Sequence, residues 1–491
     1  MFKNYNHLGY NNPYYFTEEG KFEIHPNFPD ALAHFDDEKV VDSASAIEML
    51  NKEFFLGDRT VIQNLNKTPW LAKPNNDYTR WEYDQAPKHD ILNIDEKEIA
   101  KILFQKICDE IALYIGDKKK IGILLSGGMD SRMAAGALDF LIKNNSLSNL
   151  KVTAVTWGNS NTRDVIYAKR IAERLNWEWK HYPVRAKDLL QNIKETAIYG
   201  CEYSPMHLHA IPQIRDDNDF DVILAGSYGD SVGRAEFGGK NIRYVDPLLK
   251  NIHNVSSLFR DDVFKDSIKK IENDVTSYHT LFPREKQYMQ NELDYQLHYM
   301  RRMLNPCMDL FNEKMAFYQV FSHPDVYSFM WSIHPDKRND TIYRHMLLEF
   351  TTPLDDIPWA RTGLKYGEKD GIPDTYLKRH HTYVHILQNE ILEDMKKLVL
   401  TQEFKNLEIF KYKSIEILFK LIKYFPLNSL YYTEKVAWLA SLAEMSRMYK
   451  VKANPQPKKA AFNEYFIIYE YMKRYSRNKA GYFLRKLNLI K

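Results

Sequence analysis

The sequence predicts an α/β fold: a mostly parallel sheet covered by helices on both faces, with helical C-terminal additions and a small β-rich domain in front. One observation is that, between about residues 95 and 225, short apolar runs typical of buried strands alternate with segments of helical periodicity. The other is that a polar turn with two glycines follows the first of these strands. Such alternation favours parallel strands, with ligands bound at their carboxyl ends.

The predicted elements follow this alternation in order. The expected strands span residues 121–125, 152–157, 177–182 and 221–225, and the expected helices span 95–116, from about 132, 163–175 and 186–199. The first 90 residues are rich in Asn, Asp, Pro and aromatic residues, and short strand-like pieces at 54–56 and 60–62 indicate the β-rich domain. Beyond residue 241 helical patterns dominate, at 285–318, 380–400 and 414–432.

Length and composition indicate the number of domains and exclude some classes of function. With 491 residues the chain exceeds a usual single domain, and we expect a β-rich domain at 1–92, the α/β domain at 93–375 and a helical extension at 376–491. A net charge of +3 gives no argument for a nucleic-acid partner.

Cysteine usage and hydropathy indicate the compartment. The cysteines Cys108, Cys201 and Cys307 are few and widely spaced, which predicts neither a disulfide framework nor a metal site and favours a reducing interior. The N-terminus lacks a basic-then-apolar signal, and no apolar run reaches the length of a membrane span. We therefore expect cytoplasmic residence.

The turn after the first predicted strand, Ser126-Gly127-Gly128-Met129-Asp130-Ser131, is the strongest functional motif. A strand-turn-helix leaves unpaired N–H groups at the positive end of the helix, and glycines let an anion approach them. The hydroxyl groups can add donors. A carboxylate beside bound phosphates indicates Mg²⁺, which prefers one or two carboxylates together with phosphate oxygens. The motif therefore predicts a phosphate-binding loop.

This loop is not a Walker A loop, because no Gly-Lys-Ser/Thr follows. It resembles the Ser-Gly-Gly-x-Asp-Ser loop of the ATP pyrophosphatase (PP-loop) enzymes, which cleave ATP between the α and β phosphates. Within that superfamily it is most similar to the synthetase domain of the asparagine synthetase family. Residues 156–160 resemble the family segment whose backbone receives adenine, and Asp164 matches the acidic residue that opens the next helix. Residues 225–231 resemble a second pyrophosphate and Mg²⁺ loop.

The resemblance implies ATP and Mg²⁺ as cofactors and a set of residues that bind them. The implied nucleotide-binding residues are Leu125, Ser126, Gly127, Gly128, Asp130, Ser131, Thr156, Trp157, Gly158, Gly226 and Gly229. The implied metal ligands are Asp130 and Asp230.

The sequence departs from the family pattern where the nitrogen is handled. Residues 55–62 and Trp81 are similar to the end of the family's glutaminase domain, but Phe2 stands where the family has its nucleophilic cysteine. Glutamine hydrolysis by that route needs a thiolate beside a free α-amine. We therefore expect ammonia or an amine as the nitrogen donor, with a separate glutaminase as one source. Ser227 and Ser231 also replace two family glutamates, and a serine cannot accept a proton at neutral pH.

The catalytic candidates come from the resemblance. Tyr228, beside the missing glutamate, could act in a dyad with Glu202, as Tyr and Glu do in the β-lactam synthetase relatives; the alternative is that Tyr228 packs and Glu202 caps a helix. Lys365 corresponds to the family lysine that binds phosphate from a closing loop, work suited to a compact cation. Lys369 competes for that role, and a solvated loop lysine is the alternative. His207 and His209 lack a second ligand pair, so no metal is assigned to them.

The tail from Tyr471 to Lys491 carries seven basic residues and no acidic one. Its interleaved aromatic residues leave two interpretations open: a helix drawn to anionic lipid or an acidic partner, and a terminal helix with a solvated basic face. The second is favoured.

The resemblance implies an ATP-dependent amide-forming ligase that adenylates a carboxylate, releases pyrophosphate and transfers the acyl group to ammonia or an amine. The altered residues favour a specialised small-molecule or peptide carboxylate over aspartate. One alternative is an intramolecular cyclase, similar to β-lactam synthetases or lasso-peptide cyclases. The other is a degenerate nucleotide-binding scaffold.

Overall fold

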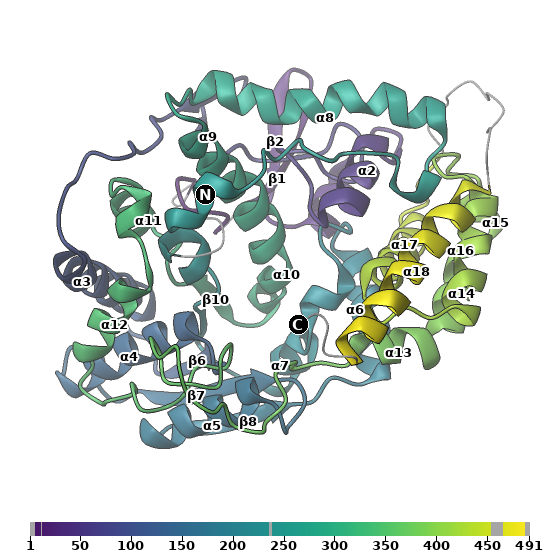
Figure 1. Ribbon diagram of the computed structural model, residues 1–491. Coiled ribbons are helices and arrows are strands. Elements are labelled where there is room, and N and C mark those ends of the chain that lie inside the picture. The colour runs from purple at the N-terminus through teal and green to yellow at the C-terminus, as the bar shows by residue number, and fades with distance from the viewer. Residues whose placement is uncertain (1–4, 11, 235–237, 453–464, 487–491) are drawn as a thin grey trace.

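The structure is a computed structural model, and it describes residues 5–10, 12–234, 238–452 and 465–486 (Figure 1). Phe2, which replaces the family cysteine, lies outside these residues. In the described part of the chain, no helix is both long enough and apolar enough to cross a membrane.

A five-stranded sheet, all of its pairs parallel, forms the centre of the α/β region in the strand order β10-β9-β6-β7-β8. Its strands are β6 (Lys120–Leu124), β7 (Lys151–Trp157), β8 (Glu178–Tyr182), β9 (Val222–Ala225) and β10 (Ala316–Gln319). The connecting helices are α3 (Glu96–Ile115), α4 (Met129–Lys143), α5 (Arg163–Arg174), α6 (Ala186–Ile198) and α7 (Ile211–Asp217). The α/β prediction is confirmed, and the four predicted strands and the helices around them lie where expected.

Alternate residues of the central strands face two different cores, as a two-residue repeat requires. Ile121 and Ile123 of β6 pack with residues of α3, α4 and α5, whereas Leu124 joins Val155 and Ile223 in a core with α7. Both faces of the central strands β6, β7 and β9 are thus buried, which explains why these strands appear in the sequence as largely apolar runs.

The fifth strand, β10, corrects the prediction of one long helical pattern over residues 285–318. That segment contains α9 (Gln287–Asp294), a π-helical stretch Tyr295–Leu304, α10 (Asn305–Met308) and a 3-10 turn Asp309–Glu313 before β10 pairs with β9. The partner that fixes β10 lies far away in sequence: the Glu110 carboxylate accepts hydrogen bonds from the Tyr318 hydroxyl at 2.5 Å and from the Phe321 backbone at 3.2 Å. The helical periodicity of the sequence does not predict that contact.

The N-terminal region combines short strands with two helices. An antiparallel sheet has the order β2-β1-β3, and β4 pairs with β5. The bounds are β1 (Tyr14–Glu18), β2 (Lys21–His25), β3 (Asn66–Lys67), β4 (Ala72–Pro74), β5 (Trp81–Tyr83), α1 (Phe28–His34) and α2 (Ser43–Lys52).

The strand pieces predicted at 54–56 and 60–62 make only single bridges, Phe54 to Tyr203 and Ile62 to Val41. Between these two pieces, side chains form hydrogen bonds with the backbone N–H and C=O groups that would otherwise pair with a neighbouring strand. The Leu56 N–H donates to Glu48, and the Gly57 carbonyl accepts hydrogen bonds from Arg301 and Arg302.

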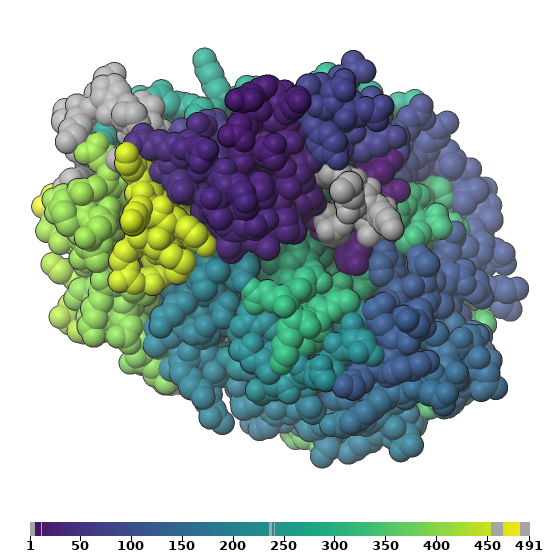
Figure 2. Space-filling model, turned by 180° about the vertical axis from the view of Figure 1, so that it is seen from behind, coloured from purple at the N-terminus to yellow at the C-terminus, as the bar shows by residue number. Residues whose placement is uncertain are grey.

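The C-terminal helices share one hydrophobic core with the N-terminal region. Ile47 and Leu50 of α2 belong to the same buried cluster as Trp438 and Leu439 of α17, and Figure 2 shows the N-terminal residues against the C-terminal helices. The remaining helices are α8 (Asp261–Leu281), α11 (Pro324–Trp331), α12 (Asp340–Leu348), α13 (Tyr383–Asn389), α14 (Leu392–Val399), α15 (Gln402–Lys405), α16 (Tyr412–Tyr424), α17 (Tyr431–Met448) and α18 (Phe466–Lys486). The division into three domains stays a prediction.

Two predictions in this region have different outcomes. The helix expected at 414–432 is two helices, because Pro426 disfavours helical backbone at the preceding residue and α16 ends at Tyr424. The basic tail lies partly in α18, and residues 487–491 fall outside the described part. A membrane or acidic partner for this tail stays a prediction.

The buried carboxyl of Glu110 should make stability depend on pH. Burial raises its pKa from 4.5 to about 8. Between these values the unfolded chain releases the proton and the folded protein keeps it, so the free energy of unfolding falls as pH rises, by up to about 1.4 kcal/mol per pH unit. Glu110→Gln should flatten this decline between pH 5 and 8 in urea unfolding. Glu98→Gln, on the exposed side of the same helix, should leave the slope unchanged, and equal slopes for wild type and Glu110→Gln would contradict the assignment.

Candidate functional site

Loops at the carboxyl ends of β6, β7 and β9 meet around one cavity of about 470 Å³. Of the residues predicted to bind nucleotide, those lining it are Leu125, Ser126, Gly128, Asp130, Ser131, Thr156, Trp157 and Gly226. Asp164 and Ser227 line it as well. Segments predicted from separate motifs thus come together at one end of the sheet, as expected for a parallel α/β fold.

The loop after β6 presents the start of α4 to this cavity. Gly128 is the N-cap residue of α4 and supplies no side-chain cap, so the first backbone N–H groups have no capping oxygen. The Ser126 and Ser131 hydroxyls lie 3.1 Å apart, and the Gly128 N–H donates to Ser126 Oγ at 3.1 Å. Uncapped N–H groups beside hydroxyls suit an anion.

Three predicted glycines do not line the cavity, and the structure gives each a packing reason. A Cβ atom on Gly127 would lie 2.9 Å from Ala360 Cβ, and one on Gly158 would lie 2.6 Å from the His380 carbonyl oxygen. A Cβ atom on Gly229 would lie 2.6 Å from Asp130 Oδ1. These glycines therefore let the loops approach one another closely.

The two predicted metal ligands lie beside the same cation. Asp230 Oδ1 lies 2.5 Å and Asp130 Oδ1 lies 3.4 Å from Nη2 of Arg234, a residue that the sequence did not single out. Burial raises the pKa of Asp130 to about 7; Arg234 opposes this shift, and the Asp230 charge adds to it. Two carboxylates that need a cation between them fit a divalent ion shared with phosphate oxygens.

The far wall of the cavity is aromatic and apolar. Trp157 stacks on His209 with ring centroids 5.2 Å apart, and Met303, Cys307 and Met308 line the same wall. Burial lowers the pKa of His209 well below its usual value. Among the described residues lining the cavity, none is Lys or Arg.

The sequence pattern did not predict this apolar wall of the cavity, for two reasons. Met303, Cys307 and Met308 fall in the segment interpreted as one core helix, and His380 lies in a part of the chain with little family signal. Of this wall, Trp157 was predicted to bind nucleotide, and His209 was considered only as a metal ligand. The spacing of the methionines gave no sign that they face a cavity.

The structure does not bring Glu202 and Tyr228 together. The Tyr228 hydroxyl donates to the Met300 carbonyl at 2.9 Å, while the Glu202 carboxylate lies 3.6 Å from Arg302 and 3.9 Å from Lys67. Both side chains are buried, and neither lines the cavity. A dyad between them has no geometric support here, and the packing alternative describes Tyr228.

The other candidates are placed as follows. Lys365 is exposed and does not line the cavity, although Trp359 and Tyr366 of its loop pack near Arg234. Ser227 lines the cavity, with its hydroxyl 3.9 Å from Met308 sulfur. Ser231 is buried, and its carbonyl accepts a hydrogen bond from Gln296 at 2.7 Å.

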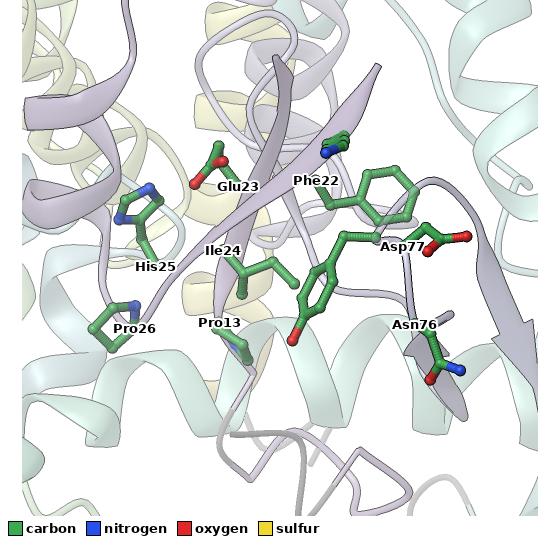
Figure 3. Close-up of a pocket in the computed structure, with 10 residues that line it drawn as sticks. Pro13, Phe22, Glu23, Ile24, His25, Pro26, Asn76 and Asp77 are labelled. Atoms are coloured by element: carbon green, nitrogen blue, oxygen red, sulfur yellow. The ribbon is translucent and has the colours of Figure 1, made fainter. Parts of the chain in front are cut away.

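A second hollow, of about 880 Å³, lies beside β2 in the N-terminal region. Figure 3 shows Phe22 and Ile24 of the strand facing Asn76 and Asp77 of a neighbouring loop. None of the residues predicted to bind nucleotide or metal lines it. The residues predicted to bind nucleotide therefore gather at the cavity beside the central sheet and not in this hollow.

Part of the chain is similar to a known protein family. Residues 113–356 match the family model described as asparagine synthase. No curated protein matches the chain. Among solved structures, the NAD+ synthetase from Burkholderia pseudomallei is similar, with 13% sequence identity and a TM-score of 0.20 over 52% of this chain and 88% of that chain.

Tyr228→Phe distinguishes packing from catalysis. Loss of the buried hydroxyl leaves the Met300 carbonyl without this donor, so we expect about 1–2 kcal/mol less unfolding free energy in urea. Ligand binding at the cavity should stay within twofold of wild type. A large loss of nucleotide binding with unchanged stability would restore Tyr228 as a functional residue.

Proposed function

We propose that this chain, whose residues 113–356 match the asparagine synthase family model, is an ATP-dependent ligase that forms an amide bond. The observation that carries the proposal is the meeting of the uncapped start of α4, the Asp130 carboxylate and the ends of β7 and β9 around one cavity, with Asp230 sharing Arg234 with Asp130.

In the proposed reaction, a carboxylate oxygen of the substrate attacks the α-phosphorus of ATP. The bond between that phosphorus and the bridging oxygen to the β-phosphorus breaks, and pyrophosphate leaves. Ammonia or an amine then attacks the acyl carbon, AMP departs, and the nitrogen loses a proton. The uncapped backbone N–H groups at the start of α4 would bind the pyrophosphate oxygens and stabilise their charge.

Asp130 and Asp230 would hold Mg²⁺, which neutralises the phosphate oxygens when it is bound. Thr156 and Trp157 at the end of β7 would contact the adenine. Lys365 lies on a loop whose neighbours pack near Arg234, which supports a role beside the phosphates after a movement of that loop.

The cysteines support an external source of nitrogen. Burial raises the pKa of Cys108 and of Cys307 to about 12, and the pKa of Cys201 well above its usual value. None of the three is a thiolate at neutral pH, and a thiolate is what glutamine hydrolysis by a cysteine needs. Ammonia or an amine would therefore reach the cavity from another protein or from solution.

The cavity wall supports an acyl substrate other than aspartate. Aspartate carries a second carboxylate beside the one that reacts, which would need a cation, and the described residues lining the cavity include no Lys or Arg. Met303 and Met308 instead offer apolar contacts to the body of a larger acid.

Pyrophosphate release tests the proposed function. With Mg²⁺-ATP, ammonia and a panel of carboxylic acids, wild type should release pyrophosphate, and Asp130→Asn should lose at least about a hundredfold in rate, since it removes one charge at the phosphates. Asp219→Asn is the matched control and should keep the wild-type rate. Asp219 lies just before β9, is exposed, and forms an ion pair with Lys120. Binding of ATP without pyrophosphate release on any acid would instead favour the scaffold.

The glycines near Asp130 supply a second test. Gly229→Ala places a Cβ atom 2.6 Å from Asp130 Oδ1, whereas Gly233→Ala meets only Met330 Cε at 3.8 Å. Displacement of Asp130 should weaken binding of Mg²⁺-ATP by at least about tenfold in Gly229→Ala, measured by calorimetry, since about 1.4 kcal/mol corresponds to each tenfold change. Gly233→Ala should bind as wild type does, and equal affinities for both variants would contradict the placement of Asp130 at the phosphates.

A further inference from the structure

Arg234 is the buried cation beneath the two predicted metal ligands. Its side chain is 1% exposed, while the Asp130 and Asp230 side chains keep 21% and 27% of their surface. One guanidinium nitrogen, Nη2, contacts an oxygen of each carboxylate, at 3.4 Å for Asp130 and at 2.5 Å for Asp230. The arginine thus approaches both carboxylates from the buried side and leaves part of each exposed.

Other groups fix the guanidinium in this place. Nη1 of Arg234 lies 2.7 Å from Asp340 Oδ1, and the group lies over the Tyr343 ring at 4.4 Å from the centroid. Asp340 Oδ1 also accepts a hydrogen bond from the Tyr366 hydroxyl at 2.9 Å. A planar cation with several donors suits such a set of carboxylates and rings. Arg234 therefore belongs to the scaffold of the site.

A fixed cation changes what the two carboxylates can bind. Two carboxylates without a cation attract any divalent ion, and a guanidinium between them removes part of that attraction. A divalent ion that arrives bound to phosphate comes with the negative charge of the phosphate oxygens. Arg234 attracts that charge as well. The pair should therefore discriminate between the free ion and the phosphate complex.

We propose that Arg234 is an internal counter-ion of Asp130 and Asp230, so that the site takes a divalent cation together with phosphate and not alone. The inference rests on the proposed function, because it needs the loop at residues 126–131 to bind phosphate. It makes Arg234 a positioning residue that acts through the two carboxylates.

Binding of Mn²⁺ without nucleotide tests this inference. Electron paramagnetic resonance would count free Mn²⁺ in titrations of wild type, Arg234→Met and Arg234→Lys. Wild type should bind Mn²⁺ alone weakly, and Arg234→Met should bind it at least about tenfold more tightly, because the carboxylates lose their counter-ion. Arg234→Lys keeps the charge and should stay nearer to wild type. A merely structural arginine would not raise metal affinity when removed.

The same titrations with ATP separate this inference from the proposed function. Wild type should bind Mn²⁺-ATP more tightly than Mn²⁺ alone, and Arg234→Met should lose most of that difference. Absence of Mn²⁺-ATP binding in wild type would overturn the proposed function. Binding of Mn²⁺-ATP, together with equal affinity for free Mn²⁺ in folded wild type and Arg234→Met, would overturn the counter-ion alone.

Two further variants keep the test decisive. Arg243→Met removes an arginine that pairs with Asp336 at 3.0 Å, in the 3-10 segment Gly239–Tyr244, and should not change Mn²⁺ affinity. Arg234→Gln also removes the charge but keeps a hydrogen-bonding side chain, and it takes the place of Arg234→Met if circular dichroism shows that the methionine variant is unfolded. Unchanged Mn²⁺ affinity in folded Arg234→Gln would equally overturn the proposal.

Discussion

The functional end of the sheet depends on one electrostatic constraint: two carboxylates, on loops from different strands, must lie side by side in a largely buried place. Unit charges 4 Å apart interact by about 4 kcal/mol at an effective dielectric constant of 20, so an uncompensated pair would push the loops apart. Arg234, with contacts to both, removes that repulsion. The position of the loop after β9 (the second loop) relative to the loop after β6 (the first loop) therefore depends on Arg234, which neither sequence motif contains.

The backbone of the second loop fits the same constraint. A Cβ atom on Gly226 would lie 2.8 Å from the Asp130 carbonyl oxygen, so this loop packs directly on the start of α4. Asp340 lies at the start of α12, and through it the cation is also joined to Tyr366. Charge and close packing thus tie the two loops to the segment that carries Lys365.

Much of this could be predicted from the sequence. The strands β6, β7 and β9 were predicted because strands buried on both faces leave continuous apolar runs, and Ser126 to Ser131 because a glycine turn before a helix has a recognisable composition. Arg234, β10 and the Met303 to Met308 wall could not, because each is defined by contacts between residues distant in the chain. Tyr228 shows the opposite case: its place beside a functional loop suggested chemistry, but its hydroxyl is used by the Met300 carbonyl in the core.

The charged groups lie at one end of the cavity, and neutral aromatic side chains lie at the other. The uncapped start of α4 places positive potential at the end formed by the first loop, and a divalent cation held by Asp130 and Asp230 would add to it where phosphates are bound. At the other end, burial keeps the imidazole of His209 neutral, and Trp157 lies against it. A molecule with both an anionic and an apolar part therefore has one favourable orientation, with its anionic part at the loops. This polarity would hold a substrate carboxylate near the α-phosphate without a cation dedicated to it, since the charges that attract ATP also orient the acid.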